Sequence, residues 1–180
     1  MTGVEQFESF VRAHQDMVYS LAIRLLGRAA DAEDVSQTVF LRAFERFGQI
    51  GDSPSAAAWL RTVARNECLN HLTRYRRRWR FFSELGQAGD REPGEEPFEA
   101  RLPAVELPGL EAAERAAHLE AALARLPDAQ RVPLVLFHFE DMSYQAIADL
   151  LGVSLAKLKT DIHRGRETLR THLSADYGSR

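Results

Sequence analysis

Apolar positions in this chain recur at helical spacing, and no segment alternates with the two-residue period of a strand. Between residues 4 and 26 they fall three, four and seven positions apart, and Gly27 follows as a helix terminator. A second helix is predicted over residues 31–47, with acids in its first turn and Gly48 closing it. The core candidates of these two helices are Phe7, Phe10, Val11, Val18, Leu21, Leu25, Val35, Val39, Phe40, Phe44 and Phe47.

A third helix is predicted to begin at the N-cap Ser53, with Pro54 in its first turn, and to continue to about Phe82. The core candidates in its first half are Trp59, Leu60 and Val63. Its second half carries five Arg within the seven residues 74–80. Residues 83–109 then hold four Pro, four Gly and seven acids without any apolar period, which is typical of a linker.

The last forty residues predict a helix-turn-helix. Ser143 and Ser154 are placed to cap its two helices, and Gly152 allows the left-handed turn between them. On the second helix an inward face is formed by Leu158, Ile162, Gly165 and Leu169. The outward face is then basic, as a helix that enters a DNA groove requires. An ordinary helical hairpin with solvated charges remains the alternative.

These segments predict an all-α protein with two small helical domains, residues 1–82 and 110–180, joined by a flexible acidic linker at 83–109. An apolar fraction of 45% in 180 residues is enough for either one core or two. The net charge of −3 conceals a basic first domain, which has 12 Arg against 9 acids. The linker has 2 Arg against 7 acids, and the last domain has 9 bases against 10 acids.

Cys68 is the only cysteine, so an internal disulfide is excluded and a reduced, structural thiol is expected. No apolar run approaches the roughly 20 residues of a membrane span, and the first residues lack the basic segment of a signal peptide. We therefore expect a cytoplasmic protein without membrane insertion.

Three segments, in order, resemble the extracytoplasmic-function (ECF) group of bacterial RNA polymerase sigma factors. Residues 31–44, DAEDVSQTVFLRAF, resemble the polymerase-docking helix. Residues 59–66, WLRTVARN, with the arginine run resemble the promoter-melting helix, and residues 126–164 resemble the second DNA-binding domain. The resemblance implies sigma2-like and sigma4-like domains in a subunit that joins core RNA polymerase, directs it to promoter DNA and helps to open the duplex, without catalysing a reaction.

The resemblance also implies a docking surface for the beta and beta-prime subunits of the polymerase. Its residues lie on or beside one helix stripe and are Asp34, Gln37, Thr38, Leu41 and Arg42. Thr38 stands where the family usually has an acid, which implies one charged contact fewer. Without the resemblance, a solvated helix face explains the same pattern.

Binding of the minus-ten element is implied for a second set, in which cations hold phosphates beside a pocket for an unstacked base. Asn66 would hydrogen-bond the flipped base, with Ile50, where the family often has an aromatic, and Val63 lining the pocket. The complete set is Ile50, Arg61, Val63, Arg65, Asn66, Arg74, Arg76 and Arg77. A solvated helix end is the alternative for the arginine run.

Recognition of the minus-thirty-five element is implied for the last helix, through Lys157, Lys159, Thr160, Asp161, His163 and Arg164. Asp161 stands where the family commonly has a basic residue. A carboxylate in the groove repels phosphate unless it accepts from a cytosine amino group or pairs with a neighbouring Arg.

An anti-sigma factor covering the docking surfaces is a further implied partner, and no cofactor or metal is expected. A stand-alone helix-turn-helix regulator explains residues 127–173 but leaves the first eighty unexplained. An enzyme finds no support, because metalloprotease, phosphate-loop and nucleophile-elbow motifs are missing and the six His are scattered.

Overall fold

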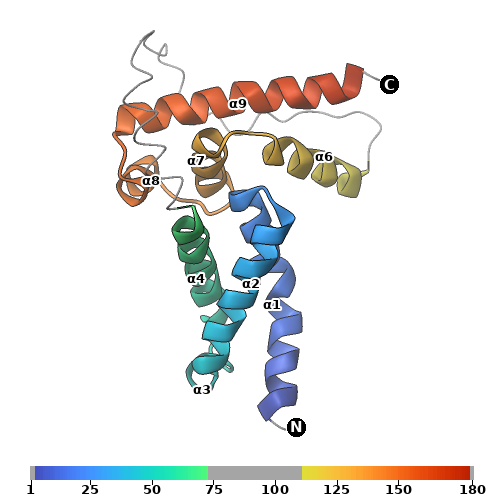
Figure 1. The fold of residues 1–180 in the computed structure, drawn as a ribbon, viewed down its shortest axis with the longest axis vertical. Coiled ribbons are helices and arrows are strands. Elements are labelled where there is room, and N and C mark those ends of the chain that lie inside the picture. Colours follow the sequence, from blue (N-terminus) through green and yellow to red (C-terminus); the bar gives the residue numbers. More distant parts are fainter. Residues whose placement is uncertain (1–2, 73–110, 179–180) are drawn as a thin grey trace. The chain divides into compact units, whose positions relative to one another are not determined.

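The computed structural model of the protein describes residues 3–72 and 111–178, and it divides the chain into two compact units, residues 1–81 and 82–180. All the regular elements in the described ranges are helices (Figure 1), so the predicted all-α class is confirmed there. We call residues 3–72 unit 1 and residues 111–178 unit 2. The predicted domain limits at 82/83 and 109/110 lie outside the described residues.

Unit 1 contains α1 (Gly3–Leu26), α2 (Ala29–Glu45), the short α3 (Phe47–Ile50) and α4 (Ala56–His71). Helices α1, α2 and α4 each contact the other two and form a bundle (Figure 1). The buried positions alternate at three and four residues, as predicted for amphipathic helices. The principal buried side chains are Val18, Leu21 and Leu25 of α1, Val35 and Val39 of α2, and Leu60, Cys68 and Leu69 of α4.

Two predicted helix ends in unit 1 are wrong. Gly48 does not close α2, which ends at Glu45, but lies within α3. Helix α4 begins at Ala56 instead of near Pro54. The reason is local: the Ser53 hydroxyl accepts a hydrogen bond from the Ser55 backbone N–H at 3.3 Å and so stabilises a turn before the helix. The predicted continuation of this helix beyond residue 72 lies outside the described residues.

Phe44 was predicted to lie in the core, and this is wrong, because 57% of its surface is exposed. Ala43 takes the buried position beside it. Phe44 lies on the same stripe of α2 as Gln37 and Leu41, at helical spacings of four and three residues. Trp59, also a core candidate, is only half-buried.

Unit 2 contains α6 (Ala112–Ala124), α7 (Asp128–His138), α8 (Tyr144–Leu151) and α9 (Leu155–Gly178). Helix α9 contacts the other three (Figure 1). The predicted inward face is confirmed, because Leu158, Ile162, Gly165 and Leu169 are all buried. At Gly165 a Cβ atom would lie 3.2 Å from the Gln130 carbonyl oxygen, so glycine permits the close approach of α7 and α9.

The predicted helix-turn-helix signals are confirmed in α8 and α9. The Ser143 hydroxyl accepts from the Ala146 N–H, and the Ser154 hydroxyl from the Lys157 N–H, both at 3.2 Å. Gly152 has a φ of 66°, and the N–H of the following residue bonds back to the Ala148 carbonyl at 3.1 Å. This is the left-handed helix exit for which glycine is suited. In the described part of the chain, no helix combines the length and apolarity needed to cross a membrane.

Candidate functional site

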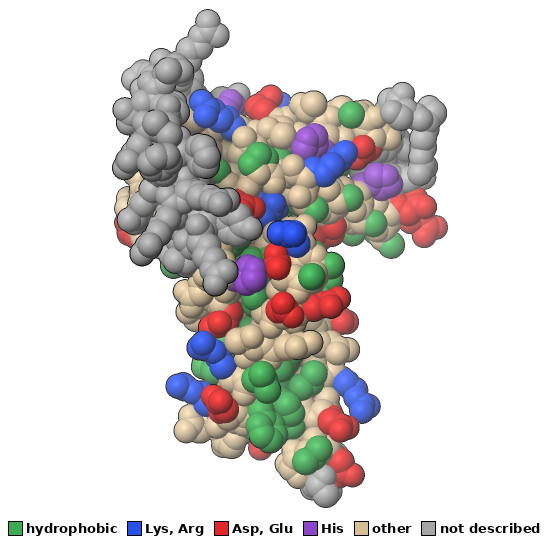
Figure 2. Space-filling model, viewed as in Figure 1, with side chains coloured by type: hydrophobic (Ala, Val, Ile, Leu, Met, Phe, Trp, Pro, Cys, Tyr) green, Lys and Arg blue, Asp and Glu red, His purple; other side chains and the backbone are tan. Residues whose placement is uncertain are grey.

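An open groove of about 850 Å³ runs between α1 and α2 of unit 1. Figure 2 shows hydrophobic side chains gathered over the part of unit 1 built by α1, α2 and α3. At one end of the groove the walls are apolar, and at the other they carry Asp16 and Glu33. The groove is lined by Phe7, Val11, Gln15, Asp16, Tyr19, Glu33, Ser36, Gln37, Phe40, Leu41 and Phe44.

Two residues of the predicted docking set, Gln37 and Leu41, lie in this groove. Leu41 is 66% exposed, which is unusual for so large an apolar side chain. Asp34 is exposed outside the groove lining, and the half-buried Thr38 donates its hydroxyl to the Asp34 carbonyl oxygen at 3.0 Å. Arg42 points away from the groove and toward α4, where its guanidinium lies 2.8 Å from the Glu67 carboxylate.

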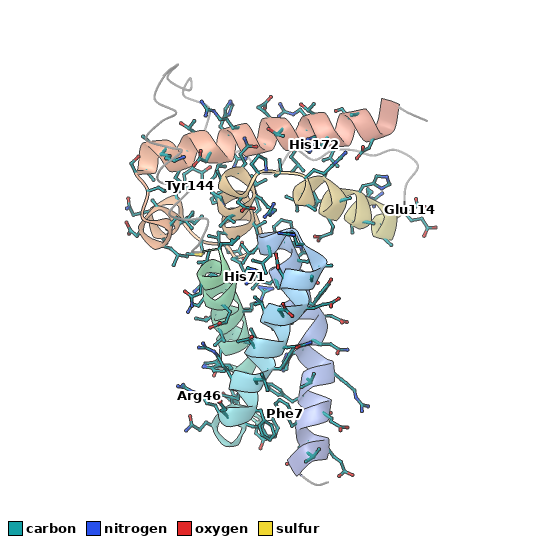
Figure 3. The ribbon with its side chains drawn as sticks, viewed as in Figure 1. Phe7, Arg46, His71, Glu114, Tyr144 and His172 are labelled. Atoms are coloured by element: carbon teal, nitrogen blue, oxygen red, sulfur yellow. The ribbon has the colours of Figure 1, made fainter. Side chains whose placement is uncertain are left out.

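Aromatic rings close the apolar end of the groove. The Phe7 ring centroid lies 5.0 Å from that of Phe44 and 5.2 Å from that of Phe47, both edge to face. Figure 3 shows Phe7 pointing from α1 toward the rings at the ends of α2 and α3. Gly51 allows this packing, since a Cβ there would lie 2.7 Å from the Phe47 ring. The prediction missed Phe44 as a groove residue, although its spacing from Gln37 and Leu41 indicated a shared stripe.

A second hollow of about 430 Å³ lies between α2 and α4, with Trp59 and Val63 on one wall. Arg42, Glu45 and Arg46 form the other wall. Asn66 is exposed and follows Trp59 and Val63 on one stripe of α4, at spacings of four and three residues. The hollow therefore brings an apolar wall next to two guanidiniums and one carboxylate, and the Asn66 amide lies on the same stripe of α4 as the apolar wall.

The prediction that Ile50 and Val63 line one pocket is not met. Ile50 is buried and does not line the hollow, because α3 turns its side chain into the core. Of the predicted cations, Arg61 is exposed and Arg65 half-buried on α4. Arg74, Arg76 and Arg77 lie outside the described residues.

On α9 the predicted recognition residues form two groups. Lys159 and Arg164 are exposed, and Thr160 and His163 are partly exposed beside them. Asp161 differs from the prediction of an outward carboxylate, because it is 7% exposed. It lies three residues after Leu158 and four before Gly165, which places it on the inward face of α9. Its carboxylate is 2.7 Å from the Lys157 ammonium.

A polar cluster that the sequence analysis missed joins α7, α8 and α9. Arg166 of α9 lies 3.4 Å from the Tyr144 hydroxyl, to which it donates, and 3.5 Å from Nε2 of His138. Its guanidinium also lies 5.8 Å from the Phe137 ring centroid, within cation–π range. Burial, together with the Arg166 charge, lowers the pKa of His138 to about 4, so the imidazole is neutral at pH 7.

Arg131 of α7 is a buried cation, with 4% of its surface exposed. It donates to the Leu126 carbonyl oxygen at 2.7 Å and pairs with the Asp128 carboxylate. Burial lowers its pKa, and Asp128 opposes the shift. These bonds hold the turn between α6 and α7. Within residues 3–72 and 111–178, no three His, Cys, Asp or Glu side chains group as metal ligands.

Family comparison assigns one region to each unit. Residues 10–78 match sigma-70 region 2, and residues 117–169 match sigma-70 region 4. The first match includes α2 and α4, and the second ends within α9.

Relatives match over nearly the whole chain. The ECF RNA polymerase sigma factor SigE of Mycolicibacterium smegmatis is 37% identical, over 96% of this chain and 63% of its own length. The RNA polymerase sigma-E factor of Streptomyces coelicolor is 33% identical, over 97% of this chain and 90% of its own. The ECF RNA polymerase sigma factor SigW of Bacillus subtilis is 27% identical, over 94% of this chain and 89% of its own length. The chain thus spans less than two thirds of SigE and most of the other two.

Proposed function

Because the chain belongs to the ECF group of the sigma-70 family, we propose that it is a sigma factor: a non-catalytic subunit that joins core RNA polymerase, directs it to specific promoters and assists opening of the duplex. The observation that carries this proposal is the presence of both sigma-70 regions, each on its own compact helical unit, in one chain. Its place of action is then the cytoplasm, where the polymerase and the promoters are.

Docking to the beta and beta-prime subunits is assigned to the α1–α2 groove. Exposed Leu41 and Phe44 provide apolar area that a partner can remove from water, and Gln37 provides a polar anchor beside them. Asp34 and Thr38 flank this surface. Arg42 would support docking indirectly, through its ion pair with Glu67 of α4.

Minus-ten recognition is assigned to the α2–α4 hollow and the exposed side of α4. Trp59 and Val63 supply the apolar wall for an unstacked base, and Asn66 an amide for its hydrogen-bonding edge. Arg61 and Arg65 supply further cations on α4, each two residues from Val63 and therefore on another side of the helix. Arg74, Arg76 and Arg77 belong to the same proposed surface on sequence grounds alone.

Minus-thirty-five recognition is assigned to the amino-terminal half of α9, which follows a capped turn as a recognition helix does. Its outward donors are Lys159, Thr160, His163 and Arg164. The acidic residues 83–109 would link the two DNA-binding units. A partner anti-sigma factor would compete with the polymerase for the α1–α2 groove, and no cofactor is required.

Co-elution of the purified chain with bacterial core RNA polymerase on a sizing column tests the proposal. Replacing both Gln37 and Leu41 with Ala should weaken the complex and leave the helix content unchanged, because both side chains face the groove. A matched control is Val4→Ala, which removes an exposed apolar side chain outside the groove lining. Undiminished binding by the double variant would remove the groove assignment.

The Asn66→Ala variant separates strand capture from docking. Transcription from duplex promoters should fall more than polymerase affinity, because Asn66 is exposed on α4 and lies outside the docking groove. Equal losses in the two assays would indicate a folding defect instead.

A stand-alone helix-turn-helix regulator is the alternative, and it leaves the match of residues 10–78 to sigma-70 region 2 unexplained. It would bind duplex DNA without polymerase. Failure of the folded chain to co-elute with core polymerase, combined with sequence-specific duplex binding, would favour that function.

A further inference from the structure

Lys157 and Asp161 form an ion pair within the first two turns of α9. The ammonium nitrogen and the carboxylate oxygen are 2.7 Å apart and one helical turn separates the residues. The Asp161 side chain is 10% exposed and that of Lys157 is 30% exposed. The pair therefore lies at the border between the packed face of α9 and its outward face, where Lys159 is exposed.

The burial of Asp161 decides where the Lys157 ammonium resides. Burial raises the pKa of the Asp161 carboxyl, and the Lys157 hydrogen bond and charge, with the charge of Arg164, oppose that rise. A buried carboxylate that loses its cation is left without compensation, which is strongly unfavourable. Moving Lys157 from Asp161 to a phosphate therefore carries a cost that an exposed lysine does not have.

This matters because a lysine affects DNA binding in two ways. A mobile lysine reaches a phosphate in any duplex and strengthens binding without regard to sequence. A lysine held in one position retains two ammonium donors after one is used by the carboxylate. The two remaining donors can bind only a duplex that presents an acceptor at that position, as the major-groove edge of guanine does.

We propose that Asp161 is a specificity-determining residue: it withholds Lys157 from non-specific phosphate binding and presents it as a fixed donor at the start of the recognition helix. The proposal rests on the proposed DNA-binding function of α9. It also reverses the sequence-based expectation for Asp161, because the carboxylate acts on the lysine beside it and does not face the groove.

The test is the salt dependence of binding of the full chain to a mixed-sequence duplex, measured by fluorescence anisotropy. Asp161→Asn keeps the side-chain shape and removes the charge, which releases Lys157. The plot of log K against log salt concentration should then become steeper by about 0.9, the value of one added phosphate contact. The ratio of affinities for a duplex selected by the wild-type chain and for the mixed-sequence duplex should fall as non-specific binding rises.

Two further variants make the result decisive. Lys157→Gln combined with Asp161→Asn removes both charges, so its slope should equal that of the wild type. A slope shallower by about 0.9 would mean that Lys157 already contacts phosphate in the wild-type complex, and would overturn the proposal. Glu167→Gln also removes one negative charge from α9, but from an exposed pair with Arg170, and should change the slope less than Asp161→Asn.

The failure of this proposal and the failure of the proposed function give different results. If the wild type binds with a clear salt slope and Asp161→Asn, folded by circular dichroism, has the same slope, the role of Asp161 is refuted while DNA binding stands. If the folded wild type shows no salt-dependent duplex binding at low salt, the DNA-binding role of α9 and the role of Asp161 fail together.

Discussion

The two units of the molecule distribute apolar and charged side chains in opposite ways. Among the described residues, the large apolar side chains left exposed are Val4, Leu41 and Phe44, all in unit 1. The charged residues that are buried in the described parts of the chain are Arg131 and Asp161, both in unit 2. Unit 1 therefore keeps apolar area at its surface, whereas unit 2 places paired charges in its interior.

This difference follows the chemistry of the proposed partners. An exposed apolar groove gains free energy when a protein partner removes it from water. Phosphates attract any cation at long range, whereas reading a base edge needs a donor held in a defined position, as Asp161 holds Lys157. When one partner of an ion pair is buried, the other partner is held beside it, because separation would leave the buried charge uncompensated. This arrangement has some cost in stability. The contrast predicts different responses of the two units to mutation.

The largest effect is expected at Arg131 of unit 2. Arg131→Met leaves the Leu126 carbonyl oxygen and the Asp128 carboxylate without their cationic donor, so the free energy of unfolding should fall by about 2–3 kcal/mol. Urea unfolding, monitored by circular dichroism, measures this change in the free energy of unfolding. The control Arg125→Met removes a more exposed partner, paired with Asp176 of α9, and should cost at most about 1 kcal/mol. Similar losses in both variants would contradict the distinction between buried and exposed pairs.

A tenfold effect on binding, with little effect on stability, is expected at Phe44 of unit 1. Phe44→Ala removes exposed area from the groove and should weaken core polymerase binding by about tenfold, or about 1.4 kcal/mol. Surface plasmon resonance on immobilised polymerase measures the affinity, and a thermal melt checks the fold. An unchanged affinity would exclude Phe44 from the docking surface.

A smaller, pH-dependent effect is expected at His138 of unit 2. Its pKa falls from 6.5 to about 4 on folding, so between these values the unfolded chain binds more protons than the folded one. Stability should therefore decrease as the pH is lowered from 6.5 to 4. Of the groups around the imidazole, Arg166 approaches from α9 and Tyr144 from α8.

Urea midpoints across this pH range measure the contribution of His138. His138→Gln should have a flatter dependence than the wild type, and His118→Gln controls for the loss of an imidazole elsewhere in unit 2. If the urea midpoints of the wild type and of His138→Gln change in parallel with pH, His138 is not the source of the pH dependence.

The last prediction concerns the reactivity of Cys68 in the core of unit 1 and involves no change in binding or stability. Burial raises the pKa of the thiol to about 12, so almost no thiolate is present at pH 7. Native protein should react with iodoacetamide far more slowly than the same protein in urea, as mass spectrometry can show. Equal rates in both conditions would mean that the α4 face of the core opens readily.

Patterns formed by residues close together on one helix were predicted well. The inward face of α9 and the two serine caps depend on residues within one or two turns of each other, so local chemistry is sufficient. The Gln37 and Leu41 positions on an exposed stripe follow from the same spacing. Phe44 and Asp161 were misjudged because apolar type was taken to mean core and charge to mean surface, although their spacing placed them on the opposite faces.

By itself, the sequence determined the helices, the glycine turn and the order of the two sigma-70 regions, because each is encoded by contiguous residues. Only the tertiary structure decided which helix stripes are covered. It left Leu41 and Phe44 exposed beside α1 and buried Asp161 within reach of Lys157. The physical reason is that helical spacing establishes which residues share a face, while the burial of that face depends on how neighbouring helices pack against it.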